Sequence, residues 1–238
     1  MRPLALGLVG SVGAVSVLAL HPRSQVFGPF PFRGPPADGR TVALTFDDGP
    51  NEPWTGRLLD VLHQREVLAT FFQVGRCAER HPDSTRRVAD AGHVLGNHSY
   101  SHAFHRYVSQ PRQRDEIERT QEILFRLSGR LPNLYRPPWL CHWPWVLRSV
   151  RRRGLQVVSG TFGSSWEVFQ PPGSRMTDSA VARTEPGSIL IFHDGREARG
   201  GPRGQSVAAV GPLIDRLRGD GYGFATVDRL LGVRPYLD

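Results

Sequence analysis

The sequence predicts an α/β fold in which a parallel sheet closes into a barrel or an incomplete barrel. Short apolar runs typical of buried strands alternate along the chain with amphipathic runs typical of helices, and about seven strands follow one another in a single domain. Polar residues suited to chemistry follow four of these strands. Because the carboxyl ends of parallel strands form one face of a barrel, this placement independently supports the same fold.

The expected strands have apolar, β-branched or aromatic character and cover residues 41–46, 68–74, 93–96, 134–136, 155–159, 189–192 and 223–227. The expected helices carry apolar residues at helical spacing and cover residues 55–64, 84–91, 113–127, 145–153 and 207–218. A glycine follows three of these helices directly, at Gly92, Gly154 and Gly219. Glycine is the residue that most readily ends a helix, so these boundaries support the assignment.

The composition indicates one folded domain with an excess of positive charge. The 238 residues suit a domain of roughly 200 residues plus an extension. The net charge is +8, and all 30 basic residues are arginine. Coding bias explains an all-arginine chain more simply than function does, but arginine binds carboxylates and phosphates well and would suit anionic surroundings. The arginines are scattered and no nucleic-acid-binding motif is present, so nucleic acid is not an expected partner. Cys77 and Cys141 lack the spacing of a structural zinc site, and their pairing stays open.

The first residues predict an export signal or a membrane anchor. Residues 3–20 are uncharged and mostly apolar, which is close to the minimum length for crossing a bilayer. We therefore expect a signal or anchor at 1–22, a Pro/Gly-rich extended linker at 23–39 and the folded domain at 40–238. The small residues around Val15 resemble a cleavage site but lie inside the apolar run, which favours an uncleaved anchor. The domain is expected to be extracytoplasmic, either membrane-anchored or secreted.

Asp47 and Asp48 end the first strand and precede a Gly-Pro turn. Adjacent carboxylates repel each other and avoid β structure, so a chain that places them there usually uses them to bind a cation or to shift a pKa. The alternative is a solvated turn, because all four residues are ordinary turn formers.

His98 and His102 lie four positions apart, just after the third strand. On one helical turn such a pair presents two imidazoles on the same face. Together with a carboxylate from Asp48 they would form a metal shell that leaves positions open for water and substrate. The alternative is a pair of surface histidines.

His193 ends an apolar strand, and Arg136 lies in a rigid Tyr-Arg-Pro-Pro turn. On the same face as the metal candidates, His193 is better read as a general acid than as a core histidine. Arg136 either caps a strand or orients one of the two aspartates. Trp139 follows this turn, and Trp54 follows the turn after Asp48. Aromatic rings at such places either serve as platforms for sugars or pack in the core.

Four motifs in this order resemble the polysaccharide deacetylases of the NodB-homology type, carbohydrate esterase family 4. They are residues 45–50 (TFDDGP), 98–102 (HSYSH), 136–139 (RPPW) and 190–194 (LIFHD). The resemblance extends over about residues 40–232. It implies a distorted (β/α)7 barrel that removes acetyl groups from N-acetylated amino sugars.

The resemblance also implies roles for individual residues. One divalent metal, most often zinc, would be bound by Asp48, His98 and His102. Proton transfers would use Asp47 as the base, His193 as the acid and Arg136 as the partner that positions Asp47. The substrate would contact Trp139, Leu140, Trp166 and Trp54, and the backbone near Trp139 would hold the oxyanion.

The sequence departs from the family pattern on the acid side. The family usually carries an aspartate before a tryptophan, and this aspartate raises the pKa of the acid histidine; here Ser165 precedes Trp166. Asp178 and Asp194 are the candidates to replace it, or else His193 is a weaker acid. Leu140 also replaces a glycine that is common at its position, which changes the expected substrate groove.

The expected function is therefore metal-dependent deacetylation of an N-acetylated glycan by a monomer. Peptidoglycan is the nearest candidate substrate, and other N-acetylglucosamine polymers come next. Two alternatives stay open: a glycan-binding relative without activity, and a hydrolase of a small non-glycan amide.

Overall fold

The computed structural model describes residues 20–35, 39–107 and 110–237. Its centre is a curved sheet whose hydrogen-bonded order is β6-β5-β3-β2-β1-β8-β7, with all of these pairs parallel. The strands are β1 (Thr41–Asp47), β2 (Thr70–Gln73), β3 (Val94–Asn97), β5 (Leu134–Tyr135), β6 (Gln156–Val157), β7 (Thr161–Phe162) and β8 (Ile189–His193). A short β9 (Gly223–Phe224) pairs with the start of β1. The predicted distorted (β/α)7 barrel is confirmed.

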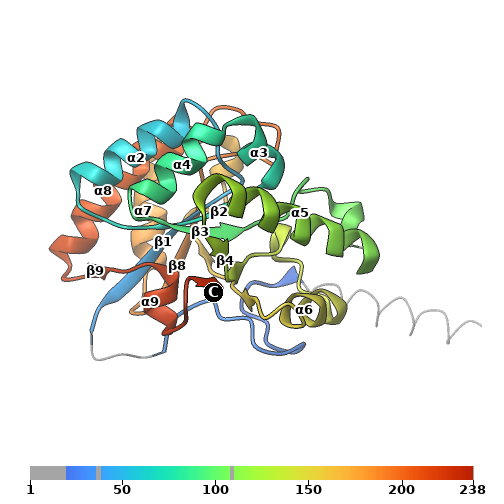
Figure 1. Ribbon diagram of the computed structural model, residues 1–238. Coiled ribbons are helices and arrows are strands. Elements are labelled where there is room, and N and C mark those ends of the chain that lie inside the picture. The colour runs from blue at the N-terminus through green and yellow to red at the C-terminus, as the bar shows by residue number, and fades with distance from the viewer. Residues whose placement is uncertain (1–19, 36–38, 108–109, 238) are drawn as a thin grey trace, which may run out of the picture.

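Helices cover the outside of this sheet, with α2, α4 and α8 at the upper left of the view and α5 and α6 at the right (Figure 1). They are α2 (Trp54–Gln64), α3 (Gly75–Arg80), α4 (Pro82–Asp90), α5 (Gln110–Ser128), α6 (Pro144–Arg151), α7 (Gly173–Arg183), α8 (Gly204–Gly219) and α9 (Val227–Leu231). The five expected helices are present, whereas α3, α7 and α9 were not expected. A small antiparallel pair, β4 (Leu131–Pro132) with β10 (Tyr236–Leu237), lies near the end of the described chain.

Strand β1 shows how the sequence directs polar side chains towards the barrel mouth. Val42, Leu44 and Phe46 belong to the apolar cluster shared with α2 and α8. Side chains alternate along a strand, so Thr45 and Asp47 point to the opposite face, into the barrel. The register then places Asp47 beside His193 of β8. The polar end of the strand is therefore directed towards the barrel mouth by the alternation of its apolar residues.

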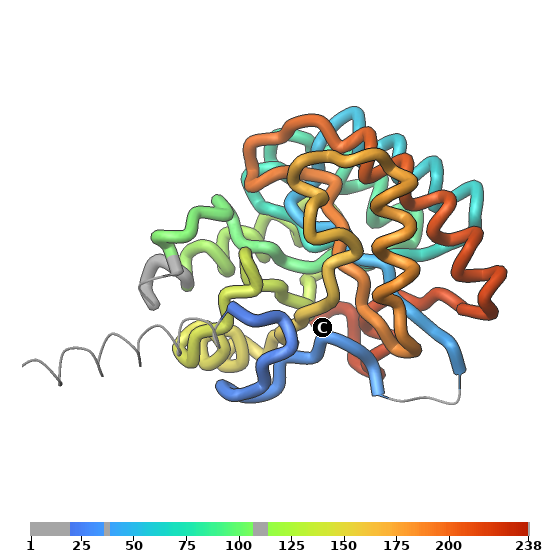
Figure 2. Tube along the Cα trace, turned by 180° about the vertical axis from the view of Figure 1, so that it is seen from behind, coloured from blue at the N-terminus to red at the C-terminus, as the bar shows by residue number. Residues whose placement is uncertain are grey.

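The barrel is open between β6 and β7, which are not hydrogen-bonded to each other among the described residues. Residues 20–35, which we call the N-terminal strap, pack at this gap. Ser159, between the two strands, donates from its backbone N to Pro31 O at 2.8 Å and from Oγ to Pro22 O at 2.6 Å. Phe30 is fully buried in the cluster that includes α6. Figure 2 shows the strap in blue beside α6.

The strap occupies much of the stretch that was expected to be an extended linker, residues 23–39. Its buried phenylalanine and its hydrogen bonds make it part of the folded domain, because a spacer would leave these groups in water. The predicted signal or anchor at 1–22 falls outside the described residues except at 20–22. Within residues 20–35, 39–107 and 110–237, no helix has the length and apolar character needed to cross a bilayer.

Candidate active site

The chemically promising residues meet at the carboxyl ends of the strands, as the sequence predicts. Asp47 ends β1 and Asp48 follows it, His98 follows β3, and His193 ends β8. Together with His102 they line one cavity of about 150 Å³. Carboxyl ends of neighbouring parallel strands open onto the same face, which explains why residues far apart in sequence converge there.

Asp48, His98 and His102 form a buried cluster suited to a metal ion. The Oδ1 atom of Asp48 lies 3.3 Å from His98 Nε2 and 3.1 Å from His102 Nε2. Its Oδ2 atom accepts a hydrogen bond from Glu197 N at 2.9 Å, whereas Oδ1 has no hydrogen-bond partner among the described residues. An orphaned carboxylate oxygen facing two imidazole nitrogens fits a divalent cation, and two histidines with one carboxylate are a common catalytic zinc set.

Neighbouring groups set the tautomer of His98 and the charge of Asp48. His98 Nδ1 lies 2.7 Å from the carbonyl oxygen of Arg136 and must donate to it, which leaves the Nε2 lone pair for a metal. Burial favours a raised pKa for Asp48. The positive charge of His102 and the close approach of both imidazoles outweigh burial and bring that pKa well below its usual value. Asp48 is therefore ionised, as an anionic metal ligand would be.

The helical turn considered for the histidine pair is wrong, because residues 98–102 form a bend. Ser99 and His102 have φ values of 67° and 54°, in the left-handed region that disfavours residues with a Cβ. The Asn97 side chain accepts from Ser99 N at 2.9 Å, and Ser99 Oγ accepts from His102 N at 3.2 Å. These bonds hold the bend. Asp48 also has a positive φ, of 73°, and such strain is concentrated at functional sites.

Arg136 lies beneath the cavity and is completely buried. Its Nη1 donates to Asp47 Oδ1 and to Thr45 Oγ1, both at 2.7 Å, and its Nη2 donates to Ser159 O at 2.8 Å. The guanidinium also lies 4.1 Å from the centre of the Phe72 ring. This cage fixes the carboxylate of Asp47 in one orientation, beside the candidate metal ligands.

His193 has a carboxylate partner that the sequence reasoning missed. Glu167 is buried, and its Oε2 lies 2.9 Å from His193 Nδ1 while its Oε1 accepts from His193 N at 2.9 Å. Ser206 Oγ donates to the same Oε1 at 2.7 Å. Burial would lower the pKa of His193, but the charge and hydrogen bond of Glu167 outweigh it and raise the pKa to about 9. The imidazole is therefore protonated at neutral pH.

Neither expected substitute for the missing aspartate reaches His193. Asp178 forms an exposed ion pair with Arg216, between α7 and α8. The carboxylate of Asp194 is buried against α2, where its Oδ2 accepts a hydrogen bond from Thr55 Oγ1 at 2.5 Å. Burial raises the pKa of Asp194 to about 7. Ser165 accepts from Arg183 at 2.9 Å. The sequence signal that could have identified Glu167 is its place directly after Trp166. In the structure Glu167 begins the short 3-10 helix η3 (Glu167–Phe169).

Only some of the residues expected to contact substrate reach the cavity. Trp139 and Leu140, in η2 (Pro138–Leu140), line the cavity; Trp139 is 36% exposed and its ring lies 4.3 Å from that of His102. Trp166 is 68% exposed and lies outside the cavity lining, although nearby Val168 is part of it. Trp54 is not brought to the cavity. It begins α2 and packs on the apolar cluster shared with α8, because α2 belongs to the outer helical layer.

Comparisons with known proteins agree with this geometry. Residues 34–158 match the family model described as polysaccharide deacetylase. A peptidoglycan-N-acetylglucosamine deacetylase of Bacillus cereus is 35% identical over 199 residues, which are 83% of this chain and 70% of the relative. A peptidoglycan-N-acetylmuramic acid deacetylase of Bacillus subtilis is 29% identical over 81% of this chain and 72% of the relative.

Comparison with solved structures finds the same family. A crystal structure of a peptidoglycan N-acetylglucosamine deacetylase, in complex with 4-naphthalen-1-yl-N-oxidanyl-benzamide, superimposes with a TM-score of 0.80. It is 33% identical in sequence, and the match covers 87% of this chain and 94% of that one. Fold, motif order and sequence identity agree, and the chain belongs to the polysaccharide deacetylase family.

Proposed function

We propose that this protein removes N-acetyl groups from amino-sugar polymers, peptidoglycan foremost, with the help of one divalent metal. The observation that carries the proposal is the buried Asp48–His98–His102 cluster, placed between a carboxylate held by Arg136 and an imidazole held by Glu167. A metal site flanked by one base and one acid is what amide hydrolysis requires.

Asp48, His98 and His102 would hold the metal, and their nitrogen and oxygen donors suit zinc. A bound zinc ion supplies a Lewis acid that polarises the amide carbonyl and lowers the pKa of water. The described residues then divide the proton transfers between them. The carboxylate of Asp47, held by Arg136, accepts a proton from the attacking water.

His193 supplies the proton for the leaving group. Its Nδ1 is engaged by Glu167, so Nε2 is the atom that donates to the amide nitrogen. The carbon–nitrogen bond breaks as the water oxygen joins the acetyl carbon, and the products are acetate and a free amine. The pKa of about 9 keeps the donor protonated at neutral pH, as a general acid must be.

The relatives support a substrate and a place of action. Their names specify peptidoglycan, with N-acetylglucosamine in one case and N-acetylmuramic acid in another. We infer that the substrate of this chain is an N-acetylated glycan of the cell wall and that the protein acts outside the cytoplasm as a monomer. The apolar run at residues 3–20 supports attachment to a membrane or secretion.

The test combines metal content with acetate release from peptidoglycan and chitin oligomers. We expect one divalent metal per chain and loss of activity on chelation, with recovery when zinc is returned. Asp47→Asn and His193→Ala should each lower kcat by roughly 10²–10⁴-fold while retaining the metal. Acetate release that persists in both variants would show that the proton-transfer roles are wrong.

The same assay addresses the alternatives. A glycan-binding relative without activity was an alternative because Ser165 cannot provide the carboxylate expected beside His193. Glu167 provides a carboxylate at His193 Nδ1, so Ser165 no longer favours that alternative. Such a protein would bind oligosaccharide without releasing acetate even when loaded with metal. A hydrolase of small amides would release acetate only from small amides and not from any glycan in the panel.

A further inference from the structure

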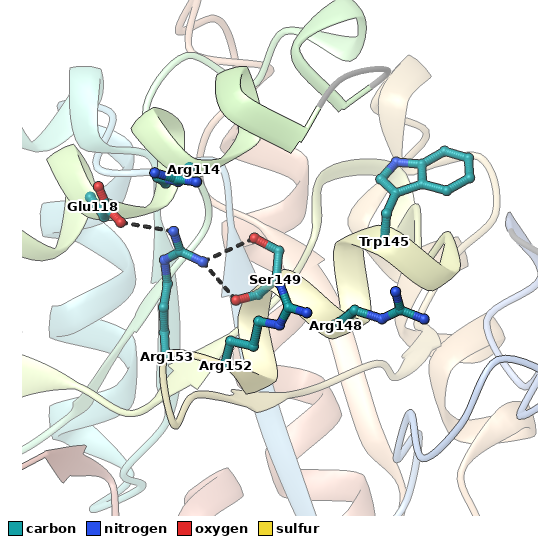
Figure 3. A pocket seen from close by; sticks show the side chains of 7 residues that line it. All are labelled: Arg114, Glu118, Trp145, Arg148, Ser149, Arg152 and Arg153. Atoms are coloured by element: carbon teal, nitrogen blue, oxygen red, sulfur yellow. Dashed lines mark hydrogen bonds and ion pairs between the residues drawn. The ribbon is translucent and has the colours of Figure 1, made fainter.

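A second cavity, of about 300 Å³, lies on the outside of the barrel between α5 and α6 (Figure 3). We call it the α5–α6 pocket. Its lining comprises Arg114 and Glu118 of α5 together with Trp145, Arg148, Ser149, Arg152 and Arg153 of α6 and the turn that follows. It shares no lining residue with the catalytic cavity.

The pocket concentrates positive charge. Arg153 is held in place by Glu118 at 2.8 Å and by the backbone O and Oγ of Ser149 at 2.7 and 3.0 Å, the contacts drawn as dashed lines in Figure 3. Arg114, Arg148 and Arg152 form no ion pair with a carboxylate of residues 20–35, 39–107 or 110–237. One carboxylate therefore faces four guanidinium groups.

The fold explains only part of this arrangement. Spacings of three, four and seven residues place Trp145, Arg148, Ser149 and Arg152 on one face of α6. Cations near the end of α6 interact favourably with the helix dipole, which accounts for Arg148 and Arg152. The dipole does not account for Arg114 on the facing helix. Like charges gathered in one cavity repel each other, and an anionic ligand would remove that repulsion.

Trp145 indicates what else the ligand carries. Its ring is half-buried and stacks on Trp143 with a centroid distance of 5.1 Å and an interplanar angle of 4°. A fixed indole face beside guanidinium groups is suited to a sugar ring that bears a carboxylate, because the ring stacks and the guanidinium binds the carboxylate in a bidentate manner. Figure 3 shows Arg148 and Trp145 on the same side of the pocket.

We propose that the α5–α6 pocket is a second glycan site, which binds a carboxylate-bearing sugar unit of the polymer whose amide groups the catalytic cavity hydrolyses. This inference rests on the proposed function, because it takes the substrate to be an anionic glycan. The pocket holds the polymer at a distance from the reacting unit. It therefore raises affinity for long anionic chains and contributes nothing for short neutral ones.

The experiment compares Arg148→Gln/Arg152→Gln with a matched control, Arg57→Gln/Arg175→Gln, in the full chain. The control removes the same charge from exposed arginines of α2 and α7. Acetate release is measured on soluble peptidoglycan strands and on short N-acetylglucosamine oligomers. The pocket variant should lower the ratio of kcat/KM on strands to that on oligomers by about fivefold, through KM, and the control should leave the ratio unchanged. Trp145→Ala should act in the same direction as the pocket variant.

A second measurement separates failure of this site from failure of the proposed function. Co-sedimentation with peptidoglycan strands reports binding without turnover. If the wild type releases acetate from no glycan, the proposed function fails, and weaker sedimentation of the pocket variant alone still supports the site. If turnover is intact but the pocket variant matches the wild type in both measurements, the site is overturned. Equal losses in the control variant also overturn it.

Discussion

At the residue scale, the pairing of His193 with Glu167 shows how a carboxylate from another position completes an acid. Glu167 begins η3, two residues after Ser165, and the extra methylene of glutamate relative to aspartate gives it reach. Its second oxygen is fixed by His193 N and Ser206 Oγ, so the carboxylate has one orientation. The chemistry requires a buried anion at His193 Nδ1 and does not prescribe which residue supplies it.

We therefore predict that Glu167→Gln shifts the alkaline limb of the pH–rate profile to lower pH. His193 acts when protonated, and Glu167 raises its pKa to about 9. A neutral amide no longer stabilises the imidazolium, so the pKa falls and activity is lost at a lower pH. At pH 8 kcat should fall on the order of tenfold, with a smaller loss near pH 6. A pH–rate profile of acetate release gives the answer.

Ser165→Ala is the matched control for this prediction. Its hydroxyl accepts a hydrogen bond from Arg183 and, among the described residues, makes none with His193, so the profile should not move. A shift of the alkaline limb in Ser165→Ala, or its absence in Glu167→Gln, would contradict the assignment of Glu167.

Arg136 gives a prediction about stability that does not depend on activity. Arg136→Met leaves the buried carboxylate of Asp47 without its partner, and breaking a buried pair in this way destabilises a fold by roughly 3–5 kcal/mol. The second variant, Asp47→Asn/Arg136→Met, removes the uncompensated charge and should recover part of that free energy of unfolding. Denaturant titration of the two variants measures the difference. Equal stabilities would mean that the pair is not a buried charge interaction.

At the element scale, the N-terminal strap closes the barrel and reaches the site through two residues, Ser159 and His142. Pro31 and Pro22 bind Ser159, whose carbonyl oxygen accepts from Arg136. Phe30 packs on the ring of His142 at a centroid distance of 4.4 Å, and His142 Nδ1 is bonded to Leu140 O in the cavity wall. The strap thus supports both Arg136 and the wall that carries Trp139.

We predict that Phe30→Ala lowers the free energy of unfolding by about 3–5 kcal/mol, since the lost ring leaves a cavity in a packed cluster. Phe32→Ala is the control within the same strap, because Phe32 is only half-buried and should cost much less. Denaturant unfolding monitored by tryptophan fluorescence compares them. If the two variants lose the same stability, or if neither loses any, the strap is not part of the domain core.

The predicted elements are determined by local sequence patterns, whereas the elements that were not predicted are determined by tertiary contacts. Strand β1 and helix α2 carry strong local periodicity, so their type and position follow from the pattern alone. Helix α7 begins after two prolines with glycine and polar residues, and its packing against α8 maintains it. The strap looks like a spacer in composition and is ordered only by tertiary contacts, which a local pattern does not contain.

The same distinction holds for the site. Asp47, His98 and His193 could be placed together because strand ends of a parallel sheet share one edge. Their convergence needed only the order of the elements. The bend that aims His102 and the approach of Glu167 depend on side-chain contacts with Ser99 and Ser206, between segments whose relation only the fold supplies.

At the scale of the whole molecule, the charge of +8 predicts how the enzyme meets its substrate. An excess of arginine creates a positive field that attracts an anionic polymer before any specific contact forms. Salt shortens the range of this field, to about 10 Å at an ionic strength of 0.1 M. Raising the salt from about 20 mM to about 500 mM should therefore lower kcat/KM on peptidoglycan strands by roughly fivefold to tenfold. Short neutral oligomers should lose less than about twofold, because they feel no net attraction. Steady-state kinetics over this salt series measures both, and an equal loss on the two substrates would show that salt acts on the folded site rather than on encounter with the polymer.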